Sequence, residues 1–307
     1  MNKNKFDIKP FLAPKHWPIW IALGFLRLCT LLPYRLQMWL GCFIGYLSYL
    51  LLPRRRHIVE KNIQLAFPDL NEAQQQKLIK KTFYSTGMSI FETAMAWWGS
   101  QRRLQSMVKI KGIEHLQNAL AQGKGVILLS AHFNCLELSG RLLSFTQPIQ
   151  VTYKRAHNPL MEAVVRHSRK KHFIDAINTY DTREMIKGLK KNVATWYAMD
   201  QDLGPRLHVF APFMGIQTCT LVTTSRLAKM SGALVVPYFP KRLDGCCKYE
   251  LTIHPALENF PSGDDLYDTT RINNLITDHV KQAPDQYLWV HRRFKTRPPG
   301  EPDVYEK

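Results

Sequence analysis

The sequence predicts an α/β protein whose largely parallel central sheet is flanked by helices, with an N-terminal hydrophobic, membrane-associated helical segment. From about residue 113 onward, short apolar runs alternate with segments of helical periodicity, which is the pattern of βαβ units in a sheet covered on both faces. Two long apolar stretches occupy the first 53 residues, and no repeat or flexible linker follows them. We therefore expect residues 1–56 to form membrane-anchoring hydrophobic helices and residues 57–307 to form one domain.

The apolar N-terminal stretches are each shorter than a comfortable membrane span. Residues 17–33 are interrupted by Arg27, and residues 36–53 carry no charge before the triplet Arg54-Arg55-Arg56. A span needs about 20 apolar residues, and the basic residues at both ends favour the cytoplasmic side for both flanks. This pattern favours a re-entrant pair or helices lying in the interface, anchored by Trp17, Trp20 and Trp39. The alternative is two buried core helices.

Two helices are expected between these stretches and the sheet. The first covers about residues 58–67, and the second covers about residues 72–98 with Asn71 as its N-cap. The second helix carries a large apolar stripe, which either packs in the core or lines a groove for an acyl chain: Met88, Phe91, Met95, Trp97 and Trp98.

The α/β region begins with a helix at residues 114–122. The strands that we expect after it cover residues 126–130, 149–153, 193–199, 233–239 and 249–253. The helices that alternate with them are a segment carrying Glu137, a segment after Asn158-Pro159, and residues 183–191, 221–230 and 270–282.

The strand at residues 126–130 ends just before His132, and Glu137 follows five positions later. On one continuous helix this step turns about 500°, so the two side chains would lie roughly 140° apart. They can meet only if His132 lies in the strand-to-helix turn and Glu137 lies one turn into the helix. That placement suits a general base oriented by a carboxylate, at the strand end where ligands of open α/β sheets bind. The alternative is a chance pair of residues.

Two further polar clusters follow predicted strands. Arg155 and Asn158 come after the strand at 149–153, and Asp200 and Arg206 come after the strand at 193–199. Asn158 before Pro159 has the form of a helix cap. We expect Arg155 to stabilise an oxyanion or bind a phosphate, with Asp200 fixing its direction. We expect Asn158 and Arg206 to bind substrate, Arg206 through an anionic group. A solvated loop arginine is the alternative for Arg155.

A basic block near the C-terminus contains Arg292, Arg293, Lys295 and Arg297 within six positions. Such a block suits polyanionic lipid headgroups or an acidic carrier protein, and we expect Arg292, Arg293 and Lys295 to bind substrate. The alternative is a solvated basic tail, although the apolar residues at 287–290 indicate a packed segment.

The charge balance agrees with anionic partners. Lys and Arg total 42 against 24 acidic residues, a formal net charge of +18, which favours nucleic acid, a membrane surface or acidic substrates. No nucleic-acid-binding signature is present, so nucleic acid is not an expected partner. The six cysteines form no C-x-x-C pair and the histidines show no H-E-x-x-H motif, so we expect a reduced compartment, no metal site and no cofactor.

Taken together, these segments resemble the late acyltransferases of lipid A biosynthesis, the lauroyl/myristoyl transferase family of Gram-negative bacteria. The step from His132 to Glu137 is similar to the H-x4-D/E motif shared with glycerolipid acyltransferases. The resemblance covers essentially the whole chain in order, and its ending looks most like the lauroyltransferase branch. The segments that carry it are Phe67-Pro68, Met95-Ala96-Trp97, Asn158-Pro159-Leu160, residues 200–205 and residues 289–297.

The resemblance implies a glycerolipid acyltransferase-like fold, with residues 57–307 as the acyltransferase domain. It implies transfer of a lauroyl-type group from acyl carrier protein to a 3-hydroxyl of an acyl chain on a lipid A precursor. The site would be the cytoplasmic face of the inner membrane, and the partners would be the carrier, the glycolipid and the anionic bilayer. His132 would act as general base and Glu137 would orient it.

Two other functions stay open on the sequence alone. Cys135 lies between His132 and Glu137 and could act as the nucleophile of a thioester hydrolase or transferase. The chain could also be a peripheral protein that binds anionic lipid without catalysis.

Overall fold

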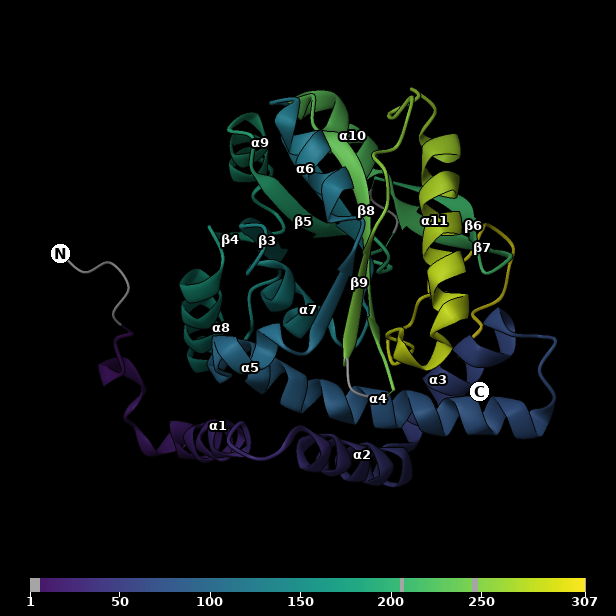
Figure 1. Cartoon of the computed structure of the whole chain (residues 1–307). Coiled ribbons are helices and arrows are strands. Elements are labelled where there is room, and N and C mark those ends of the chain that lie inside the picture. The colour runs from purple at the N-terminus through teal and green to yellow at the C-terminus, as the bar shows by residue number, and fades with distance from the viewer. Residues whose placement is uncertain (1–5, 205–206, 245–247, 307) are drawn as a thin grey trace.

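The computed structural model describes residues 6–204, 207–244 and 248–306. Its centre is a seven-stranded sheet in the order β1-β9-β8-β2-β5-β3-β4 (Figure 1). Neighbouring strands of this sheet are parallel, except for the antiparallel pair β8 and β9. The predicted α/β class with a largely parallel sheet is therefore confirmed. The strands are β1 (Val108–Lys111), β2 (Val126–Ser130), β3 (Ile149–Tyr153), β4 (Ala176–Asn178), β5 (Ala194–Ala198), β8 (Leu234–Arg242) and β9 (Tyr249–Ile253).

Helices cover both faces of this sheet because its central strands are apolar on both sides. In β2, Val126 and Leu128 pack into one core cluster, while Ile127 and Leu129 pack into the other. The first cluster contains residues of α6 (Ile113–Ala121), α7 (Leu136–Leu143) and α8 (Pro159–His172). The second contains residues of α9 (Thr182–Lys190), α10 (Thr223–Ser231) and α11 (Asp265–Gln282).

A long helix, α4 (Glu72–Trp98), crosses one end of the sheet (Figure 1). Its N-terminus is closed by a capping box, because Asn71 and Gln74 each accept a hydrogen bond from the other's backbone N–H. Glu92 of this helix forms two 2.7 Å contacts with Arg242, the last residue of β8. The helix therefore passes the carboxyl end of β8, which is also the carboxyl end of its parallel neighbour β2.

Two N-terminal helices lie beyond α4, on the side away from the sheet (Figure 1). They are α1 (Trp17–Cys29) and α2 (Tyr34–Leu51). Helix α3 (Pro53–Ala66) instead packs in the second core cluster, and the short α5 (Gln101–Gln105) follows α4. Helices α2 and α4 touch through glycines: a Cβ placed on Gly87 would lie 2.1 Å from the Gly41 carbonyl oxygen. Close packing thus joins α2 to the rest of the molecule, and a domain boundary after residue 56 stays a prediction.

Helices α1 and α2 are buried on one side only. Leu23 of α1 and Met38 of α2 lie in the core, whereas Ile21 of α1 is 72% and Trp39 of α2 62% exposed. The alternative of two buried core helices is therefore wrong. No single helix in the described ranges is long and apolar enough to cross a bilayer. Helices α2 and α3 taken together are long and apolar enough, but the angle between them is 97°.

The structure adds strands that the sequence analysis did not predict. β1 and β4 are short edge strands, and β6 (His208–Phe213) and β7 (Ile216–Leu221) form a separate hairpin. The turn of this hairpin is Met214-Gly215, and both residues have positive φ, 52° and 81°, as a two-residue hairpin turn requires. A methionine at such a position is an uncommon turn signal, which explains why the hairpin was missed.

Candidate active site

His132 and Asp200 meet at the carboxyl ends of two adjacent strands. The register of β2 and β5 pairs Ser130 with Ala198, and His132 and Asp200 each follow two residues later. His132 lies in the loop between β2 and α7, as predicted. Its Nδ1 lies 2.7 Å from Asp200 Oδ1, and its backbone N–H donates to Asp200 Oδ2 over 2.9 Å.

The charge of Asp200 decides the state of the imidazole. Burial alone would raise the pKa of the Asp200 carboxyl, but attraction to His132, the hydrogen bonds from His132 and the charge of Arg293 hold it well below its usual range. An ionised carboxylate can only accept a hydrogen bond, so we assign the ring proton to Nδ1. Nε2 is then the free basic nitrogen. This is the arrangement of a general base oriented by a carboxylate.

Glu137 has other partners than the predicted one. It lies in the first turn of α7, but no hydrogen bond or ion pair joins it to His132. Its carboxylate accepts from Arg169 Nη2 at 2.5 Å and Nε at 3.1 Å, and from the Trp97 indole N–H at 2.9 Å. The predicted contact with His132 is therefore wrong. The sequence step could not show that a carboxylate from a neighbouring strand is closer to the ring.

The Glu137–Arg169 pair is largely buried, with side-chain exposures of 12% and 15%. Burial by itself would raise the pKa of Glu137, but Arg169 and the Trp97 N–H reverse the shift and lower it. The guanidinium of Arg169 also lies over the Tyr153 ring, 5.0 Å from its centroid. Glu137 thus ties α7 to α8, α4 and β3.

Arg155 is exposed and forms no hydrogen bond or ion pair with any residue that the structure describes. The predicted pairing with Asp200 is wrong, because both carboxylate oxygens of Asp200 already bind His132.

Asn158 caps α8, as its position before Pro159 predicted: its side-chain oxygen accepts hydrogen bonds from the N–H groups of Leu160 and Met161. Its role toward substrate stays a prediction.

The basic C-terminal block divides into buried and exposed residues. Arg293 is only 1% exposed; it donates to the Cys219 carbonyl at 2.9 Å and to Thr220 Oγ1 at 2.8 Å. A side chain so enclosed cannot touch substrate, so its predicted binding role is wrong. Its charge instead supports ionised Asp200. Arg292 and Lys295 are exposed, and their substrate role stays a prediction; Arg206 lies outside the described residues.

A pocket of about 90 Å³ opens at His132. Its other side chains include Lys154, which the sequence analysis passed over in favour of the adjacent Arg155. The strand-end position after β3 is the signal that could have found it. Further lining residues are Thr152, Tyr153, Tyr180, Trp196, Gln201 and Leu203.

Cys135 is unsuited to act as a nucleophile. It is 1% exposed, and burial, reinforced by Glu92, raises the pKa of its thiol to about 12. Since the thiolate is the reactive form, the buried thiol is inert at neutral pH.

The loop that carries His132 is held by the C-terminal segment and by α4. The Asn134 N–H donates to the Gln286 carbonyl at 2.7 Å, and the Leu288 N–H donates to the His132 carbonyl at 3.0 Å. The Asn134 amide also donates to Ser85 Oγ, which accepts a second hydrogen bond from Arg242. The Glu92–Arg242 pair beneath this loop therefore helps to fix its position.

In the described part of the chain, no cluster of three or more His, Cys, Asp or Glu side chains is suited to a metal ion.

The chain is similar to known proteins over nearly its whole length. A family model described as bacterial lipid A biosynthesis acyltransferase matches residues 4–296. The chain is similar to the lipid A biosynthesis lauroyltransferase of Escherichia coli (strain K12), with 38% identity over 306 residues and 99% of each chain covered. It is 37% identical to the palmitoleoyltransferase of that organism over 298 residues, 97% of each chain. It is 25% identical to the myristoyltransferase over 310 residues, 99% of this chain and 94% of the relative.

Proposed function

Because the chain belongs to the bacterial lipid A biosynthesis acyltransferase family, we propose that it transfers a lauroyl-type acyl group from acyl carrier protein to a 3-hydroxyl of an acyl chain on a lipid A precursor. The observation that carries the mechanism is the His132–Asp200 pair at the ends of β2 and β5. Identity to the lauroyltransferase and the palmitoleoyltransferase, 38% and 37%, is higher than to the myristoyltransferase, 25%. We choose lauroyl over palmitoleoyl on the resemblance of the C-terminal block to the lauroyltransferase branch, and the mass of the product decides between them.

In the proposed reaction, His132 Nε2 takes the proton of the acceptor hydroxyl as that oxygen attacks the thioester carbonyl. The new C–O bond forms, the C–S bond breaks, and the imidazolium returns its proton to the carrier's thiolate. Asp200 orients the ring and stabilises its protonated form. We assign stabilisation of the oxyanion to the cations that follow β3, Lys154 in the pocket and Arg155 beside it.

The proposed location is the cytoplasmic face of the inner membrane. Exposed apolar side chains lie on α1 and α2, and the net charge of +18 suits an anionic bilayer and an acidic carrier. Trp20 is directed inward, since its indole N–H donates to the Phe11 carbonyl at 2.9 Å. The most exposed apolar residues of α1, α2 and the loop between them are Trp17, Ile21, Phe25, Leu28, Leu31, Trp39 and Leu51.

Vesicle binding tests whether the exposed apolar residues of α1 hold the protein on an anionic membrane. The double variant Ile21→Glu, Leu28→Glu should bind anionic vesicles on the order of 10-fold more weakly. It places two negative charges where the proposal puts two apolar side chains into the bilayer. Met230→Glu removes an exposed apolar side chain from α10 and serves as the control. Equal binding by all three proteins would contradict the proposal.

Mass spectrometry of reaction products tests the activity. The purified protein is offered a panel of acyl carrier protein thioesters with a lipid A precursor, and the product should gain the mass of a lauroyl group. His132→Ala should lower the rate on the order of 10²–10⁴-fold. The absence of any acylated product would refute the proposed reaction. A loss of rate below tenfold in a folded His132→Ala protein would refute His132 as its general base.

A further inference from the structure

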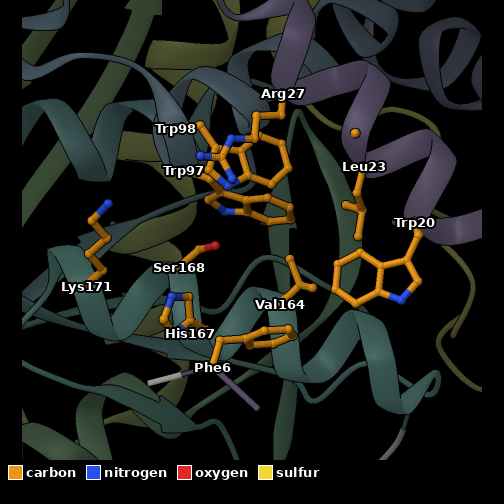
Figure 2. A pocket seen from close by; sticks show the side chains of 11 residues that line it. Phe6, Trp20, Leu23, Arg27, Trp97, Trp98, Val164, His167, Ser168 and Lys171 are labelled. Carbon is orange, nitrogen blue, oxygen red and sulfur yellow. The ribbon is translucent and has the colours of Figure 1, made fainter. Parts of the chain in front are cut away.

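A second, larger pocket lies between α1, α4 and α8. Its volume is about 410 Å³, within the range of roughly 300–1,000 Å³ found for ligand sites. Its walls combine apolar and cationic side chains: Trp20, Leu23, Trp97 and Val164 with Arg27 and Lys171. Figure 2 shows Lys171 at one end of this pocket and Trp20 and Leu23 at the other, with the Ser168 hydroxyl directed into the space between them.

The two cations of this pocket are unpaired. Neither Arg27 nor Lys171 forms an ion pair with any residue that the structure describes, although neighbouring Lys170 pairs with Asp175 and Arg169 with Glu137. Unpaired cations beside an apolar wall are complementary to an anionic amphiphile. A neutral chain would leave them without a counter-charge, and a free anion would leave the apolar wall exposed to water.

A series of contacting residues leads from the apolar surface of α1, past the pocket, toward the candidate active site. Ile21 and Leu28 lie on the exposed side of the helix that contributes Leu23 and Arg27. On the inner side, Trp97 donates to Glu137. Beyond Glu137 a small pocket is lined by Arg169 and Trp196, and Trp196 also lines the pocket at His132.

We infer that this pocket binds the acceptor lipid, with a phosphate of the acceptor between Arg27 and Lys171 and one of its acyl chains along Trp20, Trp97 and Val164. This inference rests on the proposed function, and it makes α1 part of the substrate site. An acceptor drawn from the bilayer would enter beside α1, whereas a donor on a soluble carrier has no need of that surface. The cations therefore set affinity for the acceptor.

Steady-state kinetics in mixed micelles test the inference, with the phosphorylated acceptor and the same lipid after enzymatic removal of phosphate. Arg27→Gln and Lys171→Gln should each raise the KM for the phosphorylated acceptor about 10-fold, as expected for loss of one charge-assisted contact. The KM for the acyl donor and kcat should stay at wild-type values. With the dephosphorylated acceptor, both variants should match the wild-type protein. Arg27→Lys should retain most of the affinity.

A steric variant checks the acyl-chain part independently of charge. A Cβ on Gly24, which lines the pocket, meets no atom within 4 Å, so Gly24→Leu begins its side chain in open space and reduces the volume of the pocket. It should raise the KM for both forms of the acceptor. Lys229→Gln on α10 removes an exposed charge remote from the pocket and should change neither KM.

The outcomes separate this inference from the proposed function. Acyl transfer with wild-type KM values in Arg27→Gln, Lys171→Gln and Gly24→Leu would overturn the pocket assignment alone. An equal rise for phosphorylated and dephosphorylated acceptors in the charge variants would overturn the phosphate contact. No transfer by the wild-type protein would refute the proposed function.

Discussion

Asp200 accepts two hydrogen bonds from His132, one from ring Nδ1 at 2.7 Å and one from the backbone N–H at 2.9 Å. The second bond fixes the loop as well as the ring. Because β2 and β5 are in register at Ser130 and Ala198, the sheet itself sets this contact. A side chain from the adjacent strand, rather than from the following helix, therefore orients the candidate base.

Asp200→Asn should lower kcat on the order of 10²–10⁴-fold. The amide can present an N–H to Nδ1, which favours the tautomer whose proton is on Nε2 and removes the base. Rates of acyl transfer by the folded variant measure this loss. Asp278→Asn, at an exposed position on α11, is the control. An Asp200→Asn enzyme within threefold of the wild-type rate would exclude Asp200 as the orienting residue.

Glu137→Gln should destabilise the protein by about 3 kcal/mol, because it leaves the Arg169 charge buried without a counter-charge. Denaturant unfolding in detergent measures the change in free energy. In a double-mutant cycle, Arg169→Gln added to Glu137→Gln should cost much less than the sum of the single variants. Strict additivity would show that the ion pair contributes nothing to the fold.

Cys135→Ala should retain wild-type activity, since the thiol is buried and its pKa is raised to about 12. Treatment of the native protein with iodoacetamide should likewise leave the rate unchanged. Loss of acyl transfer in a folded Cys135→Ala protein would restore the cysteine nucleophile as a mechanism.

Acidification from pH 7 to pH 5 should cost stability through His279. Burial lowers the pKa of His279 to about 4, below the unfolded value of about 6.5. The unfolded chain thus binds more protons between these values, and stability falls as pH drops through this window. The contribution is about 2 kcal/mol at pH 5.

His279→Gln tests this pH dependence, because glutamine can still donate to the Pro240 carbonyl, which lies 3.1 Å from the imidazole Nε2. Unfolding curves at pH 7 and pH 5 should differ less in this variant than in the wild-type protein. The same slope in both proteins would assign the acid sensitivity to other groups.

Gly87→Ala should destabilise the protein by about 3 kcal/mol, because its Cβ would lie 2.1 Å from the Gly41 carbonyl oxygen and would push α2 away from α4. Gly24→Ala is the matched change in a helix with nothing within 4 Å of the new Cβ. It should be neutral or stabilising by up to about 1 kcal/mol. Melting temperatures compare the two, and equal values would contradict close packing of α2 on α4.

Much of the fold could be predicted because its signals are local. The apolar run of β2, the Asn71 cap of α4 and the Asn158-Pro159 start of α8 depend on residues next to one another in the chain. The edge strand β4 and the β6–β7 hairpin escaped prediction. β4 is only three residues long and pairs with a strand from elsewhere in the chain, whereas the hairpin forms around Met214, an uncommon turn residue.

The sequence by itself determined that His132 ends a buried strand and that polar side chains gather at the strand ends. Only the tertiary structure decided which of them meet. Strand order places β5 beside β2, so Asp200 reaches the imidazole, while α8 brings Arg169 to Glu137 and the core closes over Arg293. Periodicity describes the direction of a side chain within its own element. The partner of a charge depends on which elements lie side by side, and burial then enforces that pairing.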